Sequence, residues 1–309
     1  MYRNYLRKSS FIILILLLLI FIMAGGCGAK EENTTYKTSS VEFYLQQSNG
    51  TYSLAEAVYP VNISEKIPLV VMAHGFSGTL NSGGAEELAH RLASVGIASI
   101  RMDFNPRISP EKDSYQTCLY DLQTMNEDMV LGIEYMLNHF NIDDDRIGLY
   151  GRSMGGRVVM TMANENSGHH DYKALAMVAP AGNANAMIDY MGGMQRWEKM
   201  KEEALHNDYA EHKGLKLKPS WFAMFEEYNP CETGMKFAQK PVLVICNSLD
   251  NVVTEATSRE CASAYKNSQV IEVTTDNYHG YEMGYDKSEL KDYLMEEITD
   301  FFYDSLCRL

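Results

Sequence analysis

The sequence predicts an α/β protein built on a mostly parallel sheet with helices on both faces. Strand-like and helix-like segments alternate along most of the chain. Several strand-like segments are continuous apolar runs, as in strands buried on both faces, and a hairpin signal precedes the alternation. With 309 residues, of which 46% are hydrophobic and 22% charged, the chain is long enough to bury the core that such a sheet needs.

The hairpin signal is Asn49-Gly50, a dipeptide that favours a tight turn between two strands. Further strands are expected where short apolar or β-branched runs stand between helical patterns. The expected strands are 41–47, 51–58, 69–73, 97–104, 146–150, 175–179, 241–246 and 269–274. A hairpin followed by repeated strand–helix units indicates eight strands in a largely parallel sheet.

Helical periodicity fills the intervals between most of these strands. The expected helices are 85–95, 115–140, 154–163, 255–265 and 290–303. Between Pro180 and Pro241 no strand is expected, and this segment is rich in Met, Trp, Tyr and Phe. Because it is too long for a loop between consecutive strands, residues from about 183 to 238 are interpreted as an inserted, mainly helical cap.

The first residues have the pattern of a bacterial lipoprotein signal. Three basic residues among the first eight precede an unbroken apolar run at 11–23, and Ala24-Gly25-Gly26-Cys27 follows. We therefore expect a signal peptide at 1–26, lipidation of Cys27, a flexible polar tether at 27–40 and a folded domain at 41–309. The competing interpretation is an uncleaved signal anchor. Both interpretations hold the domain at the cell membrane, facing outside the cytoplasm.

Charge and cysteine usage exclude several classes of protein. The net charge of −14 argues against a nucleic-acid partner, which would need clustered Lys and Arg. The five cysteines beyond Cys27 are scattered, without the spacing of a zinc site or a disulfide framework. One pair could be bridged in an oxidising compartment, and the sequence leaves open which. No HExxH motif is present, so neither a metal nor a cofactor is predicted.

Gly151-Arg152-Ser153-Met154-Gly155 is a G-x-S-x-G motif between an expected strand and an expected helix. In that setting the serine stands on a sharp, strained turn, and the glycines remove Cβ atoms that would collide there. The start of the helix offers free N–H groups to a developing oxyanion. Ser153 is therefore the predicted nucleophile. The alternative is an ordinary turn serine that caps the helix.

A nucleophilic serine needs a base and an orienting acid, and with this motif they follow in the order acid, then histidine. His279 follows a late strand and precedes the last helix, so it is the predicted base. Asp250 directly follows the strand at 241–246, at the sheet edge where such sites gather. It is favoured as the acid over Asp276, which stands three residues before His279.

The oxyanion hole needs one N–H from the residue after the nucleophile and one from an earlier strand–helix loop. Met154 is expected to supply the first. Phe76 is expected to supply the second, because Gly75 permits a tight turn after the strand at 69–73. His74 is expected to be structural.

His74-Gly75-Phe76, Gly151-x-Ser153-x-Gly155, Asp250 and His279-Gly280, in this order, resemble the α/β-hydrolase superfamily over roughly residues 41–309. Within it the chain looks most similar to serine esterases of the cinnamoyl/feruloyl type, close to the dienelactone-hydrolase and prolyl-oligopeptidase-like branches. The grounds are VVMAHGFSGT, GIASIRMDFN, KPVLVICNSLD and a cap after VAPAG. The chain departs from such esterases at Pro106-Arg107-Ile108-Ser109, where they carry a Gly-His-Gly-like turn, and at Arg152, where they carry His.

The resemblance implies a carboxylic ester hydrolase that acts on a small-molecule ester through an acyl-enzyme. The Met- and aromatic-rich cap favours an aryl, hydroxycinnamoyl or short acyl group, although most of these side chains are expected to pack the cap onto the domain. A peptidase or acyltransferase of the same fold is the alternative, and so is a non-catalytic ligand-binding lipoprotein. Arg152 is expected to brace the turn through an acidic neighbour rather than to face the substrate. The oligomeric state is left open.

Overall fold

The computed structural model describes residues 35–48, 50–104, 119–233, 237 and 239–308. The predicted signal peptide and Cys27 lie outside these ranges. So do residues 106–109, where the sequence departs from that of similar esterases. Within the described ranges, no helix combines the length and the apolar character needed to cross a membrane.

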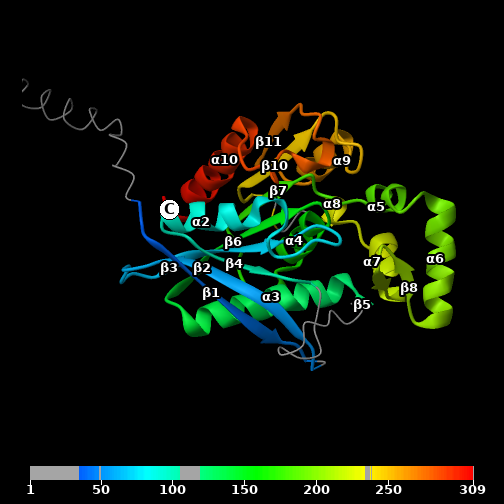
Figure 1. Ribbon diagram of the computed structural model, residues 1–309, viewed down its shortest axis with the longest axis horizontal. Helices are drawn as coiled ribbons and strands as arrows, with labels where there is room; N and C mark the ends of the chain where they lie inside the picture. The colour runs from blue at the N-terminus through cyan, green and yellow to red at the C-terminus, as the bar shows by residue number, and fades with distance from the viewer. Residues whose placement is uncertain (1–34, 49, 105–118, 234–236, 238, 309) are drawn as a thin grey trace, which may run out of the picture. The chain divides into compact units, whose positions relative to one another are not determined.

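Eight strands form one sheet in the order β1-β2-β4-β3-β6-β7-β10-β11. Their bounds are Thr38–Gln46 (β1), Tyr52–Pro60 (β2), Ile67–Ala73 (β3), Ala98–Met102 (β4), Ile142–Arg152 (β6), Ala174–Val178 (β7), Val242–Asn247 (β10) and Ser268–Val273 (β11). The β1–β2 and β2–β4 pairs are antiparallel, and every other neighbouring pair is parallel. The prediction of an eight-stranded, mostly parallel sheet is confirmed (Figure 1).

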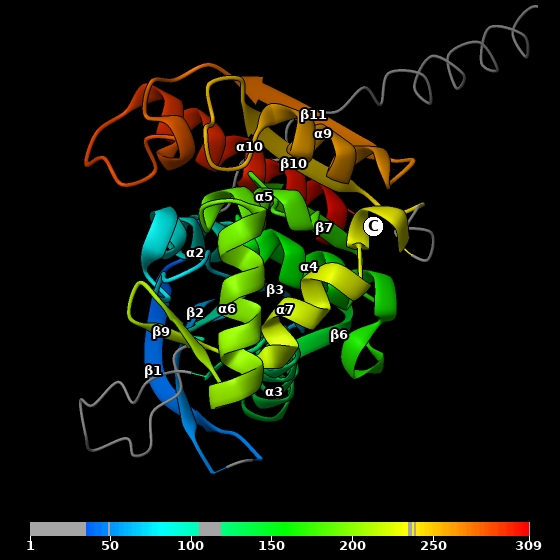
Figure 2. The same ribbon diagram turned by 90° about the vertical axis from the view of Figure 1, so that its right-hand side faces the viewer.

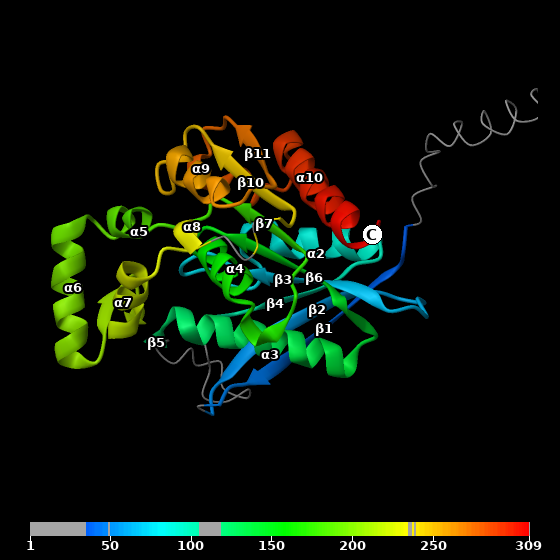
Figure 3. The same ribbon diagram turned by 180° about the vertical axis from the view of Figure 1, so that it is seen from behind.

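Helices cover both faces of the sheet because alternate residues of its strands point to opposite sides. In β3, Leu69 and Val71 pack into the core under α3, α4 and α9, whereas Val70 and Met72 pack into the core under α2 and α10. The bounds of these helices are Ala85–Ser94 (α2), Leu122–His139 (α3), Met154–Glu165 (α4), Glu255–Ser263 (α9) and Glu289–Leu306 (α10). Figures 1 and 3 show α10 and α3 on opposite sides of the sheet.

The segment between β7 and β10, which we call the cap segment (residues 183–238), lies beyond one end of the sheet (Figures 1 and 3). Viewed from that end, α6 and α7 lie in front of the strands (Figure 2). The bounds of its elements are Ala184–Tyr190 (α5), Met194–Asn207 (α6), Ala210–His212 (β8), Leu215–Leu217 (β9), Pro219–Glu227 (α7) and Pro230–Thr233 (α8). Most of its large aromatic side chains pack against one another, for example Trp197 on Phe222 with ring centres 4.9 Å apart.

Three expectations about the elements were wrong. The cap segment contains strands, since β8 and β9 pair with each other and β9 also pairs with β5 (Leu119–Tyr120). The helix expected from residue 115 begins at Leu122, because Asp121 caps it by accepting a hydrogen bond from the Gln123 N–H. The sheet begins at Thr38 and so includes residues 38–40 of the expected tether, because β2 extends to Pro60 and pairs with Thr38.

Candidate active site

Ser153 stands at the junction between β6 and α4 in a strained backbone conformation. Its φ of 55° and ψ of −121° lie outside the regions that side chains ordinarily adopt. The surrounding backbone holds this turn: the Ser153 N–H donates to the Val178 carbonyl at 2.9 Å, and the Ser153 carbonyl accepts from the Gly156 and Ala181 N–H groups. The turn therefore carries the serine side chain away from both elements, into a pocket described below.

The glycines of the motif are required by close approach of backbone. A Cβ on Gly151 would lie 2.3 Å from the Gly155 carbonyl oxygen, and a Cβ on Gly155 would lie 2.2 Å from the Ala73 carbonyl oxygen. Both distances are far shorter than a van der Waals contact. The chain can therefore pass from β6 into α4 beside β3 only with glycine at both positions.

His279 and Asp250 come together although 29 positions separate them. The Nδ1 atom of His279 lies 2.7 Å from the Asp250 Oδ2, and the Asp250 side chain is fully buried. The Asp250 Oδ1 accepts hydrogen bonds from the N–H groups of Val252 and Val253 at 2.8 and 3.0 Å. A carboxylate held in this way fixes the orientation of the imidazole and leaves its Nε2 free to face the pocket. The rival acid, Asp276, is exposed.

Two residues that the sequence reasoning missed hold this pair in place. The Tyr281 hydroxyl donates to the Asp250 Oδ2 at 3.2 Å and is itself buried. The Asn247 side chain donates to the Thr275 and Tyr278 carbonyls at 2.9 and 2.7 Å, which ties the end of β10 to the turn that carries His279. The position of Asn247 at the carboxyl end of β10 is the signal that would have found it.

The loop after β3 carries His74 and Phe76. His74 is buried, and both ring nitrogens are engaged: Nδ1 bonds the Gly75 carbonyl at 2.7 Å and Nε2 accepts from the Phe104 N–H at 3.0 Å. Burial lowers the pKa of His74 to about 4, so the ring is neutral at pH 7. These contacts agree with the structural role expected of His74. Phe76 lines the pocket, and Met154 is the first residue of α4.

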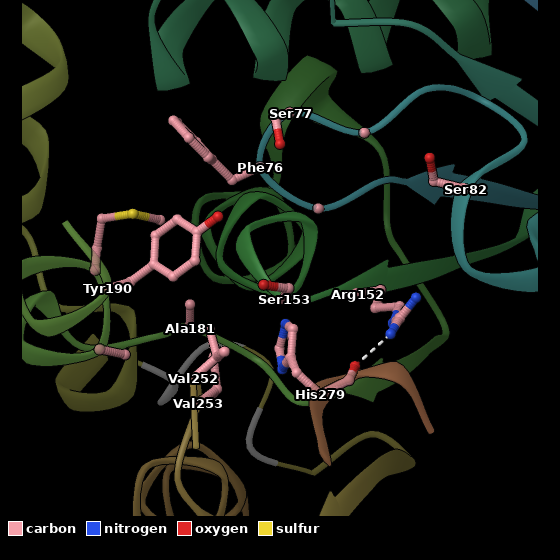
Figure 4. A pocket seen from close by; sticks show the side chains of 14 residues that line it. Phe76, Ser77, Ser82, Arg152, Ser153, Ala181, Tyr190, Val252, Val253 and His279 are labelled. Atoms are coloured by element: carbon pink, nitrogen blue, oxygen red, sulfur yellow. Dashed lines mark hydrogen bonds between the residues drawn. The ribbon is translucent and has the colours of Figure 1, made fainter. Parts of the chain in front are cut away.

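Arg152 braces the site, but through carbonyl groups and not through the acidic neighbour that was expected. Its guanidinium donates to the carbonyl oxygen of His279 (Figure 4) and, at 3.1 Å, to that of Gly280. Gly83 leaves room for it, since a Cβ there would lie 2.2 Å from the Arg152 Nη1. The residue before the candidate nucleophile thus holds the turn that carries the candidate base.

The candidate nucleophile and base face the same pocket, which has a volume of about 280 Å³ (Figure 4). Figure 4 marks no hydrogen bond between the side chains of Ser153 and His279. Such hydrogen bonds are often long in enzymes without a bound substrate and shorten when the substrate binds. The rest of the wall comes from the loop after β3, from α5 and from the residues after Asp250, together with Ser82, Arg152 and Ala181, and it is mostly apolar. Its larger apolar side chains are Phe76, Met187, Tyr190, Val252 and Val253.

The fold and this site define an α/β-hydrolase. A serine on a strand–helix turn, and an aspartate–histidine pair from the later strands, lie at one edge of a mostly parallel sheet. Residues 122–307 match the prolyl oligopeptidase family. The chain belongs to that family, and its class is that of the serine hydrolases.

Two curated relatives and one solved structure are similar to this chain. Quorum-quenching protein AidA of Acinetobacter baumannii is 32% identical over 100 residues, which are 32% of each chain. An uncharacterized 31.7 kDa protein of Escherichia coli is 30% identical over 149 residues, 48% of this chain and 49% of that one. The matches thus span half or less of these relatives. Est1E from Butyrivibrio proteoclasticus, solved with ferulic acid, has a TM-score of 0.68 at 22% identity, over 86% of this chain and 99% of Est1E.

Proposed function

We propose that this protein hydrolyses carboxylic esters through an acyl-enzyme on Ser153. The observation that carries the proposal is the strained Ser153 turn facing the same apolar pocket as a histidine held by a buried aspartate. Such a pair lets the histidine accept the serine proton and stabilises the imidazolium that forms.

In the proposed reaction, the Ser153 hydroxyl attacks the acyl carbon while His279 accepts its proton. The N–H groups of Phe76 and Met154 stabilise the oxyanion, and His279 returns the proton to the leaving alcohol. Water activated by the same histidine then releases the acid and regenerates the serine. Asp250 keeps the imidazole oriented in both halves of the reaction.

The apolar wall of the pocket favours an uncharged acyl group. Phe76, Met187 and Tyr190 offer rings and a thioether to an aryl or short alkyl chain. The small volume fits a group of this size better than an extended chain. The ferulic acid bound to Est1E is an aryl acid and agrees with this preference.

The first test is covalent labelling by a fluorophosphonate, compared between the native protein and Ser153→Ala. We expect labelling of the native protein alone, and a loss of roughly 10⁶-fold in kcat for the variant. No labelling of either protein would sink the proposal and favour a non-catalytic ligand-binding protein. Equal labelling of both would sink it by placing the reactive nucleophile at another residue. Matched melting temperatures would show that the variant is folded.

The choice of acid is tested by Asp250→Asn beside Asp276→Asn. The amide keeps the shape of the side chain but removes the charge that stabilises the imidazolium, so we expect kcat to fall by roughly 10³-fold or more. Because Asp276 is exposed, its variant should stay within about twofold of the native rate. A larger loss in the Asp276 variant would transfer the role to that residue.

The family match makes a peptidase the second candidate. A panel separates the two: p-nitrophenyl esters of increasing chain length, a hydroxycinnamate ester and peptide p-nitroanilides. We expect the highest kcat/KM on a short or aryl ester. Faster cleavage of a peptide anilide would assign the site to peptides, and transfer to an added alcohol in place of water would indicate an acyltransferase.

We also propose that the domain is tethered outside the cytoplasm by a lipid on Cys27. The support is the sequence pattern at residues 1–27. Metabolic labelling with an alkyne fatty acid should mark the native chain and not Cys27→Ser. Labelling of both chains, or of neither, would contradict the anchor.

A further inference from the structure

Two cysteines outside the candidate active site lie against each other. Cys231 in α8 and Cys261 in α9 have their Sγ atoms 3.0 Å apart, closer than two sulfur atoms in ordinary van der Waals contact. Cys261 is fully buried, and Cys231 is partly exposed. Neither takes part in the proposed ester hydrolysis, so their close approach needs another explanation.

The backbone at Gly182 lies close to both sulfur atoms. A Cβ on Gly182 would lie 2.4 Å from the Cys261 Sγ and 2.6 Å from the Cys231 Sγ. The Cys261 thiol also lies 3.6 Å from the Pro180 carbonyl oxygen. Thus Gly182, which directly precedes the cap segment, Cys231 near the end of that segment and the core helix α9 meet at one point.

We propose that Cys231 and Cys261 form a disulfide bond that fastens the return of the cap segment to α9. The two thiols lose two protons and two electrons to a disulfide donor, either a protein or a small molecule, and that donor is reduced to two thiols. The occurrence of the bond in the cell rests on the proposed location outside the cytoplasm, where such donors operate.

The oxidation takes place in two thiol–disulfide exchange steps, and the solvent exposure of each cysteine assigns which one reacts first. Cys231 is within reach of solvent, so its thiolate attacks the donor and forms a mixed disulfide. The pKa of the Cys261 thiol is raised well above its ordinary value, by its contact with Cys231 and by burial. Once the mixed disulfide has formed beside it, the Cys261 thiol loses its proton to solvent. Its thiolate then attacks the Cys231 Sγ and releases the second thiol of the donor.

The other described cysteines offer no competing pair. Cys246 is buried in β10, where burial raises its pKa to about 11, and Cys307 follows α10. Among the residues that the structure covers, neither of these lies against a second sulfur. Among the described cysteines, Cys231 and Cys261 are therefore the pair placed to form the disulfide that the sequence left open, and Cys118 lies outside the described residues.

The bond would hold a junction that touches the pocket wall without touching the reacting groups. Ala181, the neighbour of Gly182, lines the pocket and donates its N–H to the Ser153 carbonyl at 3.0 Å. Closing a loop of about thirty residues restricts the unfolded chain. We therefore expect the bond to raise resistance to heat and to leave the rate on a short ester unchanged at 25 °C.

The direct test is peptide mapping of the full chain after export through an oxidising compartment. Free thiols are alkylated under denaturing, non-reducing conditions before digestion. We expect one linked pair of peptides containing Cys231 and Cys261, two hydrogen atoms lighter than the separate peptides. A second arm incubates purified, reduced protein with oxidised glutathione. Alkylation of both thiols in both arms overturns the bond; a link in the glutathione arm alone supports the bond and overturns the proposed location.

Melting temperatures give an independent readout with matched variants. Dithiothreitol should lower the melting temperature of the oxidised protein by roughly 5 °C. Cys231→Ser should abolish this shift, and Cys307→Ser should retain it. All three proteins should hydrolyse a p-nitrophenyl ester within about twofold of one another at 25 °C, because none of these thiols lines the pocket. A shift that persists in Cys231→Ser would overturn the assignment.

Discussion

A single side chain, Arg152, connects the two loops on which the proposed chemistry depends. It stands beside the candidate nucleophile and donates to the carbonyl oxygens of His279 and Gly280. Hydrogen bonds from a charged donor contribute about 1.5–3 kcal/mol each. Their energy here fixes where the imidazole stands relative to Ser153, so we regard Arg152 as a positioning residue.

We expect Arg152→Ala to lower kcat by roughly 10- to 100-fold with a smaller change in KM. Arg152→Lys should recover part of the rate, because the ammonium group can still donate to one of the two carbonyl oxygens. The measurement is the split between kcat and KM, with melting temperatures to check folding. A variant with normal kcat and a raised KM would instead place Arg152 in contact with the substrate.

The sequence predicted the residues of the site by type and order, but not the contacts that hold them. Ser153, Asp250 and His279 were predicted because their motif and order have a chemical meaning, and the structure pairs Asp250 with His279 and places Ser153 and His279 at one pocket. Asn247 and Tyr281 were not, because their partners depend on loop conformation: Tyr281 adopts a φ of 54°, which no local pattern signals. The acidic partner expected of Arg152 was wrong for the same reason, since carbonyl groups have no sequence signature.

At the scale of elements, helix α4 links the candidate nucleophile to the cap segment. Arg157 lies in the first turn of that helix and is 1% exposed. Its guanidinium donates to the carbonyl oxygens of Gly182, Met224 and Tyr228. Burial lowers its pKa to about 10, so it remains charged at pH 7. One buried cation thus joins Gly182, which directly precedes the cap segment, to α7 and the residue after it.

We expect Arg157→Gln to lower the free energy of unfolding by about 2–4 kcal/mol, because it leaves buried carbonyl groups without a donor. Arg196→Gln is the control: Arg196 is exposed on α6, and its loss should cost less than about 0.5 kcal/mol. Urea denaturation measures both. Similar stability of the two variants would mean that the carbonyl groups find other donors, and that α7 does not depend on Arg157.

The elements that the sequence predicted well are those long enough for their hydrophobic pattern to be recognised. Strands β3 and β7 are apolar throughout and β10 is apolar up to Asn247, as their burial on both faces requires. Strands β8 and β9 have three residues each, too few for alternation to show. Helix α3 begins after Asp121, whose side chain caps it. The helical periodicity of the sequence continues on both sides of Asp121, so the hydrophobic pattern alone did not locate the start of the helix.

At the scale of the whole molecule, two buried groups give its stability a pH dependence of opposite sign. Asp128 is 1% exposed beside Gln47, and burial raises its pKa from 3.8 to about 7. His74 is buried beside Phe104, and its pKa falls from 6.5 to about 4. Neither group takes part in the proposed reaction, so each acts on stability alone.

The signs follow from which state holds the proton. Between pH 4 and 7, folded Asp128 keeps a proton that the unfolded chain has lost, so its contribution to stability falls as pH rises. Between pH 4 and 6.5, the unfolded chain protonates His74 while the folded protein does not, so that contribution rises with pH. The two contributions therefore oppose each other over this range.

Asp128→Asn should isolate the contribution of Asp128 to the pH dependence of stability. The amide keeps an acceptor for Gln47 but has no proton to lose, so the variant gains stability relative to the native protein by up to about 4 kcal/mol between pH 4 and pH 7. Urea unfolding at several pH values measures the difference, in which every group common to both proteins cancels. The exposed Asp145→Asn serves as the control and should show no such trend. A difference that stays constant with pH would mean that Asp128 is ionised in the folded protein throughout, with water or a cation compensating its charge.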